Sequence, residues 1–138
     1  MKLLYKIKNE MLDILFRLRA IDYNLCDIPS SANIPKTTVF HHKGLGVVIS
    51  NGVRLGEYVN ISQFVTIGAG DGNHPGHPTI GNHVMIYPYA CIIGDVHIGD
   101  NAIIGAYSLV THDVPAGCVA FGIPAKVVRM RIEKDVVI

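Results

Sequence analysis

The chain has 138 residues, of which 49% are hydrophobic and only 17% are charged, and its formal net charge is +1. This length indicates one domain, and the near-neutral charge without a basic run argues against nucleic-acid binding. The cysteines Cys26, Cys91 and Cys118 lack the spacing of metal ligands, so no metal is expected. An odd number of scattered cysteines is typical of a reducing compartment, which predicts a cytoplasmic protein with Cys91 and Cys118 as packing residues.

Residues 1–25 are predicted to form an amphipathic helix. Apolar residues alternate at spacings of three and four, which gives one narrow stripe: Leu4, Ile7, Met11, Ile14, Leu18 and Ile21. Charged residues interrupt every apolar stretch, so we expect neither a signal peptide nor a membrane-spanning segment. We expect the stripe to pack on the first part of the domain or on a neighbouring subunit. Peripheral contact with a membrane surface is the alternative, and it is disfavoured because the polar face mixes acids with bases.

From residue 26 to 128 the dominant pattern is an aliphatic residue at every sixth position. The series is Ile49, Leu55, Ile61 and Ile67, then Ile80, Ile86, Ile92, Ile98, Ile104 and Val110. Four residues after most of these positions stands a second small or apolar residue, such as Val53, Val84 or Ala102. A period of six fits neither a helix nor one long alternating strand, and it predicts a solenoid of short strands joined by tight bends. Gly81, Gly99 and Gly117 recur at three times this period, so three faces should complete one coil.

Two irregular segments interrupt this pattern. Residues 68–79 are rich in glycine and proline and carry His74 and His77, which predicts a protruding loop rather than a strand. Ile67 and Ile80 are one position further apart than two periods. The loop is therefore expected to take the place of one aliphatic position of the series and to add a single residue. The second segment, residues 40–46, holds His41 and His42. The other histidines, His83, His97 and His112, lie on the regular repeats and are expected to face outward in structural roles.

These features resemble the hexapeptide-repeat acyltransferases, and in particular the serine acetyltransferases and related polysaccharide O-acetyltransferases. Matching pieces are the stretch from Asp27 to Ile34, the stretch from His42 to Ser50, and Gly-His77-Pro-Thr-Ile. The separations between Asp27, His42 and His77 along the chain match as well. The ending Gly-Ile-Pro-Ala-Lys126 is similar to a terminal signature of acyl-CoA-dependent members. The resemblance implies an all-β fold, a left-handed parallel β-helix of about five coils, with residues 129–138 as a tail.

The resemblance also implies the chemistry, an acetyl transfer from acetyl-CoA to a hydroxyl group. A neutral histidine can take the hydroxyl proton near pH 7, and a carboxylate can hold its tautomer. We therefore expect His42 as the general base and Asp27 as its partner. His77 and His74 are candidate acceptor-binding residues, and Gly68, Ala106 and Lys126 are candidates for contact with acetyl-CoA. The resemblance further implies a homotrimer with sites between subunits.

Two departures from the serine enzymes bear on the acceptor. Gly76 replaces an arginine suited to a substrate carboxylate, and His41 replaces an acid suited to an amino group. Because both charges are missing, the sequence favours a sugar of a surface polysaccharide or its precursor as acceptor. Serine, as in cysteine biosynthesis, is the alternative. Tyr89 and Tyr107 are separated by three periods and are expected to stack on adjacent coils, either to line a ligand groove or to stabilise the coil.

Two further classes compete with this interpretation. A metalloenzyme of the γ-carbonic anhydrase type would draw three histidine ligands from His42, His74 and His77, but the acid-rich context of that family is missing. A scaffold without catalytic activity is permitted by the solenoid alone. The register of Asp27, His42 and His77 argues against the scaffold, so the enzyme remains the favoured interpretation.

Overall fold

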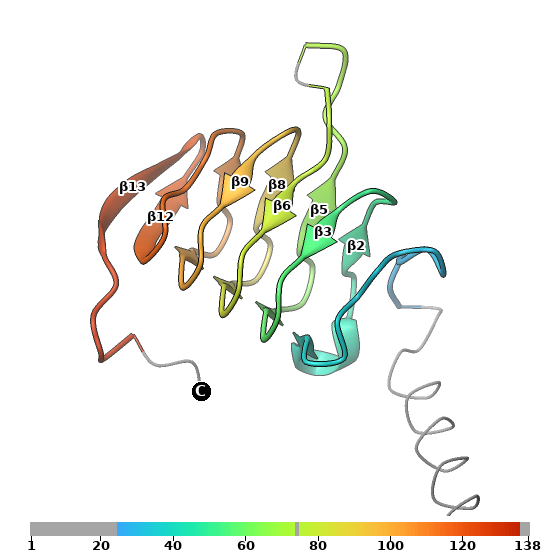
Figure 1. Cartoon of the computed structure of the whole chain (residues 1–138), viewed down its shortest axis with the longest axis horizontal. Coiled ribbons are helices and arrows are strands. Elements are labelled where there is room, and N and C mark those ends of the chain that lie inside the picture. The colour runs from blue at the N-terminus through green and yellow to red at the C-terminus, as the bar shows by residue number, and fades with distance from the viewer. Residues whose placement is uncertain (1–24, 74, 136–138) are drawn as a thin grey trace, which may run out of the picture.

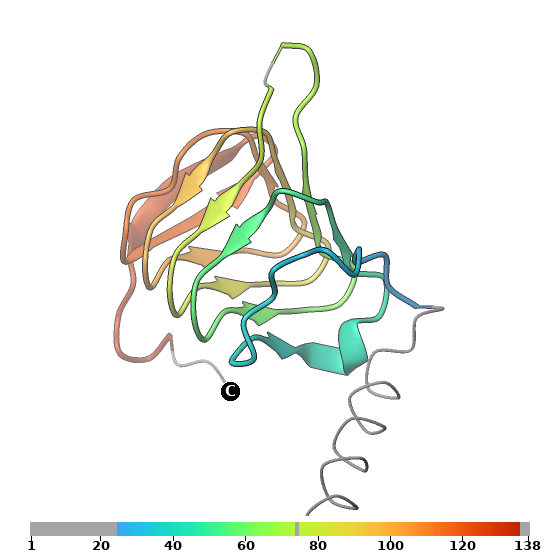
Figure 2. The ribbon, with the colours of Figure 1, turned by 45° about the vertical axis from the view of Figure 1, so that its right-hand side comes forward.

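The computed structural model describes residues 25–73 and 75–135 of the chain. Short parallel strands in these residues form three sheets that wind around one core, with the coils stacked side by side (Figure 1). Figure 2 views the same coils obliquely, as stacked three-sided turns. The predicted helix over residues 1–25 and the candidate His74 lie outside the described residues, except for Leu25, which lies in a turn. No helix in the described part of the chain is long and apolar enough to cross a membrane.

The three sheets are named here A, B and C. Sheet A contains β2 (Val48–Ile49), β5 (Thr66–Gly68), β8 (Cys91–Ile93) and β11 (Leu109–Val110). Sheet C contains β3 (Arg54–Leu55), β6 (Thr79–Ile80) and β9 (His97–Ile98). Sheet B contains β1 (Val39–Phe40), β4 (Asn60–Ile61), β7 (Met85–Ile86), β10 (Ile103–Ile104), β12 (Cys118–Gly122) and β13 (Ala125–Met130). The chain visits the sheets in the order A, C, B, which confirms the prediction of three faces per coil.

The aliphatic series with the period of six forms the core. Ile49 pairs with Ile67, and Ile67 pairs with Ile92, so identical side chains stack on successive coils. The isoleucines of the series are at most 1% exposed, and the second series, from Val53 to Val114, is buried with them. Leu55 differs, since it is only partly buried at the edge of the core. Each buried isoleucine contributes about 1.5–3 kcal/mol through removal of apolar surface from water.

The bends between sheets show two features, close approach of successive coils and left-handed backbone conformations, and each occurs at more than one kind of bend. At the bend from sheet C to sheet B, consecutive coils approach closely, and a Cβ on Gly81 would lie 2.7 Å from the backbone nitrogen of Asp100. At the bend from sheet B to sheet A, Phe64, Tyr89 and Tyr107 have φ of 57°, 62° and 57°, a left-handed conformation that costs roughly 1–2 kcal/mol per residue. Their rings stack with centroids 4.8 and 4.7 Å apart, which offsets part of this cost. The predicted stacking of Tyr89 on Tyr107 is therefore confirmed.

The protruding loop differs in size from the prediction. Ile67 and Ile80 lie on successive faces, A and then C, rather than two faces apart. The coil from Ile67 to its partner Ile92 is seven positions longer than the regular coil from Ile49 to Ile67. The loop therefore inserts these seven positions into one bend. The expectation that it takes the place of one aliphatic position and adds a single residue was wrong. Both arrangements give the same spacing between Ile67 and Ile80. One period of six residues plus seven inserted residues is as long as two periods plus one inserted residue.

At the C-terminal end, β13 turns back and pairs antiparallel with β12, with a cis peptide bond between Ile123 and Pro124 in the connecting turn. β13 runs through Met130. After it, Arg131 donates hydrogen bonds to the backbone oxygens of His83 and Asn101 on two successive coils. The last described residues are thus tied to the side of the β-helix.

Candidate active site

The candidate carboxylate Asp27 lies at the start of sheet A. Its backbone forms a parallel bridge to Val48, with hydrogen bonds from Asp27 N to Val47 O and from Ile49 N to Asp27 O, both 2.9 Å. The neighbouring residues Cys26 and Ile28 pack against the core, so the Asp27 side chain points away from it. The carboxylate is therefore exposed on the outer face of sheet A, beside β2.

The candidate base His42 lies in a short 3-10 turn, η1 (His41–Gly44), at the bend between sheets B and A. His42 (φ 51°, ψ 35°) and Lys43 (φ 58°, ψ 27°) both have left-handed backbone conformations, which are unfavourable for residues with a Cβ. The turn is closed by hydrogen bonds from Leu45 N to His42 O and from Val47 N to Gly44 O. The His42 side chain is exposed. Its neighbour His41 is half-buried, with Nε2 3.2 Å from Asn60 Oδ1.

No hydrogen bond in the described part of the chain joins Asp27 to His42, although residues 25–28 run beside the segment that follows η1. Gly46 N donates to Leu25 O, and Asp27 N donates to Val47 O. The two candidates therefore belong to adjacent backbone segments of the first coil. Their direct pairing stays a prediction.

His77 lies in the second half of the protruding loop, at the bend between sheets A and C. Its ring lies over Gly52 of the preceding coil, where a Cβ would be 2.9 Å from Cδ2 and Nε2. Gly76 faces Asp95 of the following coil, where a Cβ would be 2.6 Å from Asp95 Cβ. The base of the loop is closed by a hydrogen bond from Gly70 N to Gly76 O. The histidine is thus exposed, but its position is set by coils on both sides.

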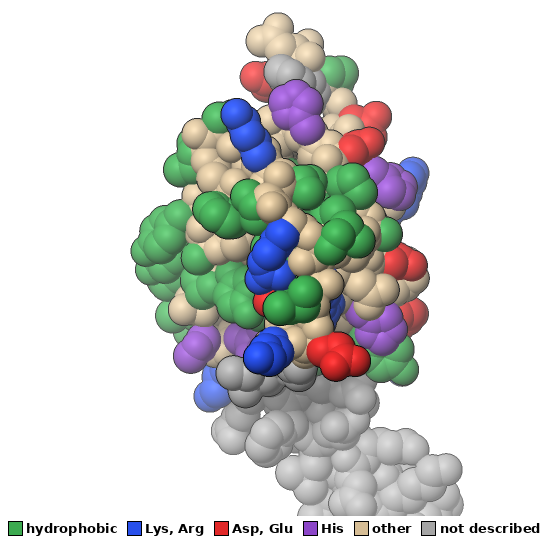
Figure 3. Space-filling view, turned by 90° about the vertical axis from the view of Figure 1, so that its left-hand side faces the viewer, with side chains coloured by type: hydrophobic (Ala, Val, Ile, Leu, Met, Phe, Trp, Pro, Cys, Tyr) green, Lys and Arg blue, Asp and Glu red, His purple; other side chains and the backbone are tan. Residues whose placement is uncertain are grey.

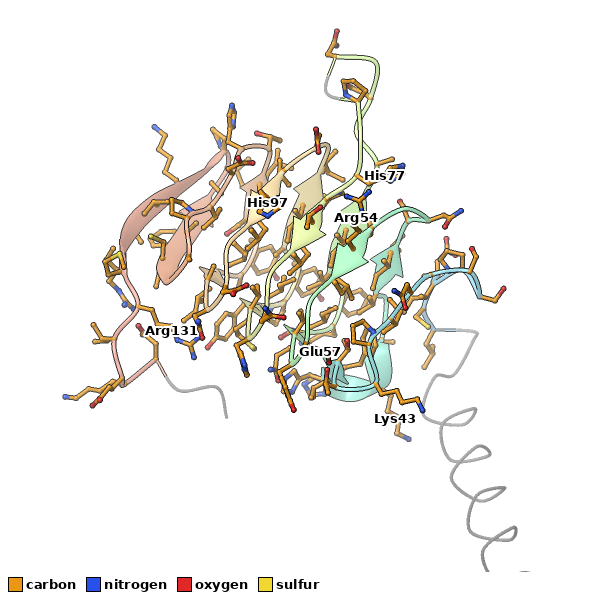
Figure 4. The ribbon with its side chains drawn as sticks, in the orientation of Figure 1. Lys43, Arg54, Glu57, His77, His97 and Arg131 are labelled. Atoms are coloured by element: carbon orange, nitrogen blue, oxygen red, sulfur yellow. The ribbon has the colours of Figure 1, made fainter. Side chains whose placement is uncertain are left out.

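His42 and His77 lie at different bends, His42 between sheets B and A and His77 between sheets A and C. The chain enters sheet A through the η1 turn and leaves sheet A through the bend that contains Gly52 and carries His77. Figure 4 shows His77 at the top, at the foot of the loop, and Lys43, next to His42, at the bottom. One face of the prism therefore separates the two histidines within a single chain.

A surface hollow of about 270 Å³ lies at the foot of the loop on sheet A. Ala69, Gly70, Asp71, Ile93, Leu109 and Thr111 line it. Gly68 borders it, because the Ile93 side chain lies 3.2 Å from where a Cβ of Gly68 would be. The hollow combines apolar walls with a few polar groups, which is the usual make-up of a small-molecule site.

The other two candidates for acetyl-CoA contact lie away from this hollow. Ala106 is exposed at the bend between sheets B and A, next to Tyr107. Lys126 is exposed on β13, opposite Phe121. Figure 3 views the end of the molecule that carries β13, where hydrophobic and basic side chains are intermixed. The structure thus brings only Gly68 to the hollow.

The remaining histidines match the expectation of outward-facing residues. His83, His97 and His112 are all exposed. The His83 ring stacks on Tyr58 with a centroid distance of 4.9 Å, and the His97 backbone N–H donates to Asp113 Oδ1. Within the described residues, no group of three or more His, Cys, Asp or Glu side chains is arranged to hold a metal ion.

Two contacts at these segments were not predicted from the sequence. Asn60 holds His41, and Gly52 provides the surface on which His77 rests. Each contact joins residues one coil apart. The regular period of the repeat gives approximately the separation between His41 and Asn60. Gly52 and His77 lie on either side of the loop insertion, so their contact cannot be predicted without the length of that insertion.

Comparison with known proteins gives a consistent set of relatives. A family model described as bacterial transferase hexapeptide (six repeats) matches residues 77–112. Serine acetyltransferase from Staphylococcus xylosus is 37% identical over 128 residues, which cover 91% of this chain and 58% of that protein. The structure of Neisseria gonorrhoeae serine acetyltransferase in complex with serine has 35% identity and a TM-score of 0.69, and the match covers 89% of this chain and 50% of that one.

A serine acetyltransferase structure in complex with CoA has 31% identity and a TM-score of 0.69, with 91% of this chain and 51% of that chain covered. This chain therefore spans less than two thirds of the length of each of these relatives. The likeness supports the left-handed winding expected from the resemblance. The repeats, the three sheets of mostly parallel strands around one core and these relatives together show that the chain belongs to the hexapeptide-repeat acyltransferase family.

Proposed function

We propose that this protein is an acetyl-CoA-dependent O-acetyltransferase with serine as its acceptor. The observation that carries the proposal is the likeness to serine acetyltransferases, which extends over 89% of this chain for the relative in complex with serine and 91% for the relative in complex with CoA. The matched part includes the segments that hold Asp27, His42 and His77. Serine was the alternative acceptor from the sequence, and the relatives favour it over a sugar.

In the proposed reaction, His42 takes the proton of the acceptor hydroxyl as its oxygen attacks the acetyl carbonyl carbon. The thioester C–S bond then breaks, and the sulfur leaves as the thiol of CoA after it receives the proton from His42. Asp27 would stabilise the protonated imidazole and hold its tautomer. Backbone N–H groups of the glycine-rich loop are suited to stabilise the negative oxygen of the tetrahedral intermediate. No covalent enzyme intermediate is required.

The separation of His42 from His77 supports a site shared between subunits. One face of the prism lies between these residues in a single chain, so both can reach one acceptor only if they come from different copies. A homotrimer with three equivalent sites satisfies this condition. Under this arrangement, light scattering should find the active protein as a trimer, and an active monomer would contradict it.

A sugar hydroxyl is the second candidate acceptor, and two observations favour it. Gly76 has φ of 113° and faces Asp95 closely, so an arginine at this position would be strained and would collide. His41 is engaged with Asn60 rather than free to bind a substrate. The two charges that would recognise a free amino acid in the serine enzymes are missing at these positions, and an arginine at position 76 would require rearrangement.

The test is release of the CoA thiol from acetyl-CoA with serine, sugars and nucleotide sugars assayed side by side. Turnover with serine supports the first acceptor, and turnover with a sugar alone supports the second. Replacing His42 by Ala should lower kcat by a factor on the order of 10² to 10⁴ if it is the general base. The His112→Ala variant is the matched control, because His112 is an exposed histidine on a regular coil. No thiol release with any acceptor would contradict the proposal.

A further inference from the structure

The residue before the candidate base makes a defined contact with the next coil. His41 Nε2 lies 3.2 Å from Asn60 Oδ1, and Asn60 Nδ2 donates to the backbone oxygen of Tyr58 at 3.2 Å. The second hydrogen bond fixes the orientation of the Asn60 amide, since only its NH₂ group can donate. Asn60 therefore presents its oxygen to His41, and His41 must be the donor at Nε2.

This contact anchors one side of a strained turn. His42 and Lys43 are left-handed, and Gly44 follows with φ of 73°. Conformations of this kind persist only where the surrounding structure holds them. The side chains of His42 and Lys43 are exposed and do not anchor the turn, whereas His41 is half-buried. Asn60 is itself fixed, because it pairs with Val39 of β1 and with Met85 of β7.

We propose that the His41–Asn60 pair is the positioning device of the candidate base. It fixes the backbone at the start of the left-handed turn and thereby the direction in which the His42 imidazole leaves the bend. His41 acts through His42 and does not touch the acceptor. This inference rests on the proposed role of His42 in acetyl transfer.

The first experiment removes the hydrogen bond from either side. Asn60→Leu and His41→Phe should each lower kcat by roughly ten- to a hundred-fold, because a displacement of about 1 Å in a catalytic group has effects of this size. KM for acetyl-CoA should stay within about twofold, since the substrate contacts are not removed. His41→Gln keeps a side-chain N–H donor and should recover most of the activity. His97→Phe is the matched control, because it makes the same exchange of histidine for phenylalanine at an exposed position on sheet C.

A double-mutant cycle separates positioning from a structural effect. In a His42→Ala background, His41→Phe should cause little further loss of kcat, because the group that it positions is already gone. A full additional loss in that background would overturn the inference. So would wild-type kcat for both His41→Phe and Asn60→Leu. If His42→Ala itself keeps wild-type activity, the proposed role of His42 fails, whatever the His41 variants do.

The thermal unfolding midpoint of each variant confirms that the folded protein is being assayed.

Discussion

The imidazole of His77 rests on the backbone of Gly52, one coil earlier, and leaves no room for a side chain at that position. Gly52 also has φ of 90°, a conformation that L-residues with a Cβ rarely adopt. Gly52 therefore allows the backbone conformation of this bend and also leaves room for the ring of a candidate substrate-binding residue.

Replacing Gly52 by Ala should displace His77 and weaken the fold. The added methyl would lie 2.9 Å from two ring atoms of His77, and the backbone strain should cost about 1–3 kcal/mol of unfolding free energy. Gly72→Ala is the matched control, because nothing lies within 4 Å of a Cβ there. Denaturant unfolding should show a loss only for Gly52→Ala, and the acetyl-transfer assay should show a loss for Gly52→Ala. Equal behaviour of the two variants would contradict the contact.

The stacked isoleucines should be the most costly residues to shorten. Ile86 is fully buried between Ile61 and Ile104 in sheet B, so Ile86→Ala should lower the unfolding free energy by about 2–5 kcal/mol. Ile123 is 73% exposed, so Ile123→Ala should change it by less than about 0.5 kcal/mol. Chemical denaturation of both variants measures the difference, and similar costs would mean that the core is not where the structure places it.

The aromatic stack should contribute measurable stability. Tyr107→Ala keeps a Cβ in the left-handed conformation but removes the ring that stacks on Tyr89 at 4.7 Å with an interplanar angle of 2°. Loss of this stacking should cost about 0.5–1.5 kcal/mol beyond the buried area. Tyr107→Ala in a Tyr89→Ala background should then cost less than in the wild type. Fully additive effects in this cycle would show that the rings do not interact.

The thiol of Cys91 should react slowly. Cys91 is half-buried on the outer side of sheet A, and burial raises the pKa of its thiol. Because the thiolate is the reactive form, less of it is present near pH 8 than for an ordinary cysteine. In a Cys26→Ser, Cys118→Ser background, alkylation by iodoacetamide should be much slower in the native protein than in denaturant. Equal rates would contradict the burial.

Asp135 should stabilise the C-terminal segment at neutral pH but not in acid. The Arg129 guanidinium binds it at 2.5 and 2.7 Å, and with the Ile132 N–H it holds the pKa of this carboxyl well below its usual range. A depressed pKa in the folded state gives stability that is present above the ordinary carboxyl pKa and is lost as the pH falls through the folded value. Asp135→Asn should therefore speed hydrogen exchange at the Ile132 amide near pH 7, and the difference from wild type should shrink in strong acid. A constant difference across this range would contradict the ion pair.

Much of the fold could be predicted from the sequence because its signal is local and repetitive. Each coil repeats the same short pattern, so the inward positions from Ile49 to Val110 could be identified without knowledge of contacts. The size of the loop insertion could not, since the spacing between Ile67 and Ile80 fits two different placements of Ile80. Only the pairing of Ile67 with Ile92 distinguishes them.

The candidate site divides in the same way. The amino-acid pattern alone predicts the period, the three faces and the outward histidines, because side-chain direction in short strands follows from position. The candidates Asp27, His42 and His77 came from the resemblance to the acyltransferase family. The stacked coils were needed to show that His42 and His77 lie at different bends, that His41 is held by Asn60, and that His77 rests on Gly52. These relationships depend on how the coils stack through backbone hydrogen bonds, because stacking brings residues that are one coil apart into contact. For Gly52 and His77 the length of the loop between them decides the contact as well.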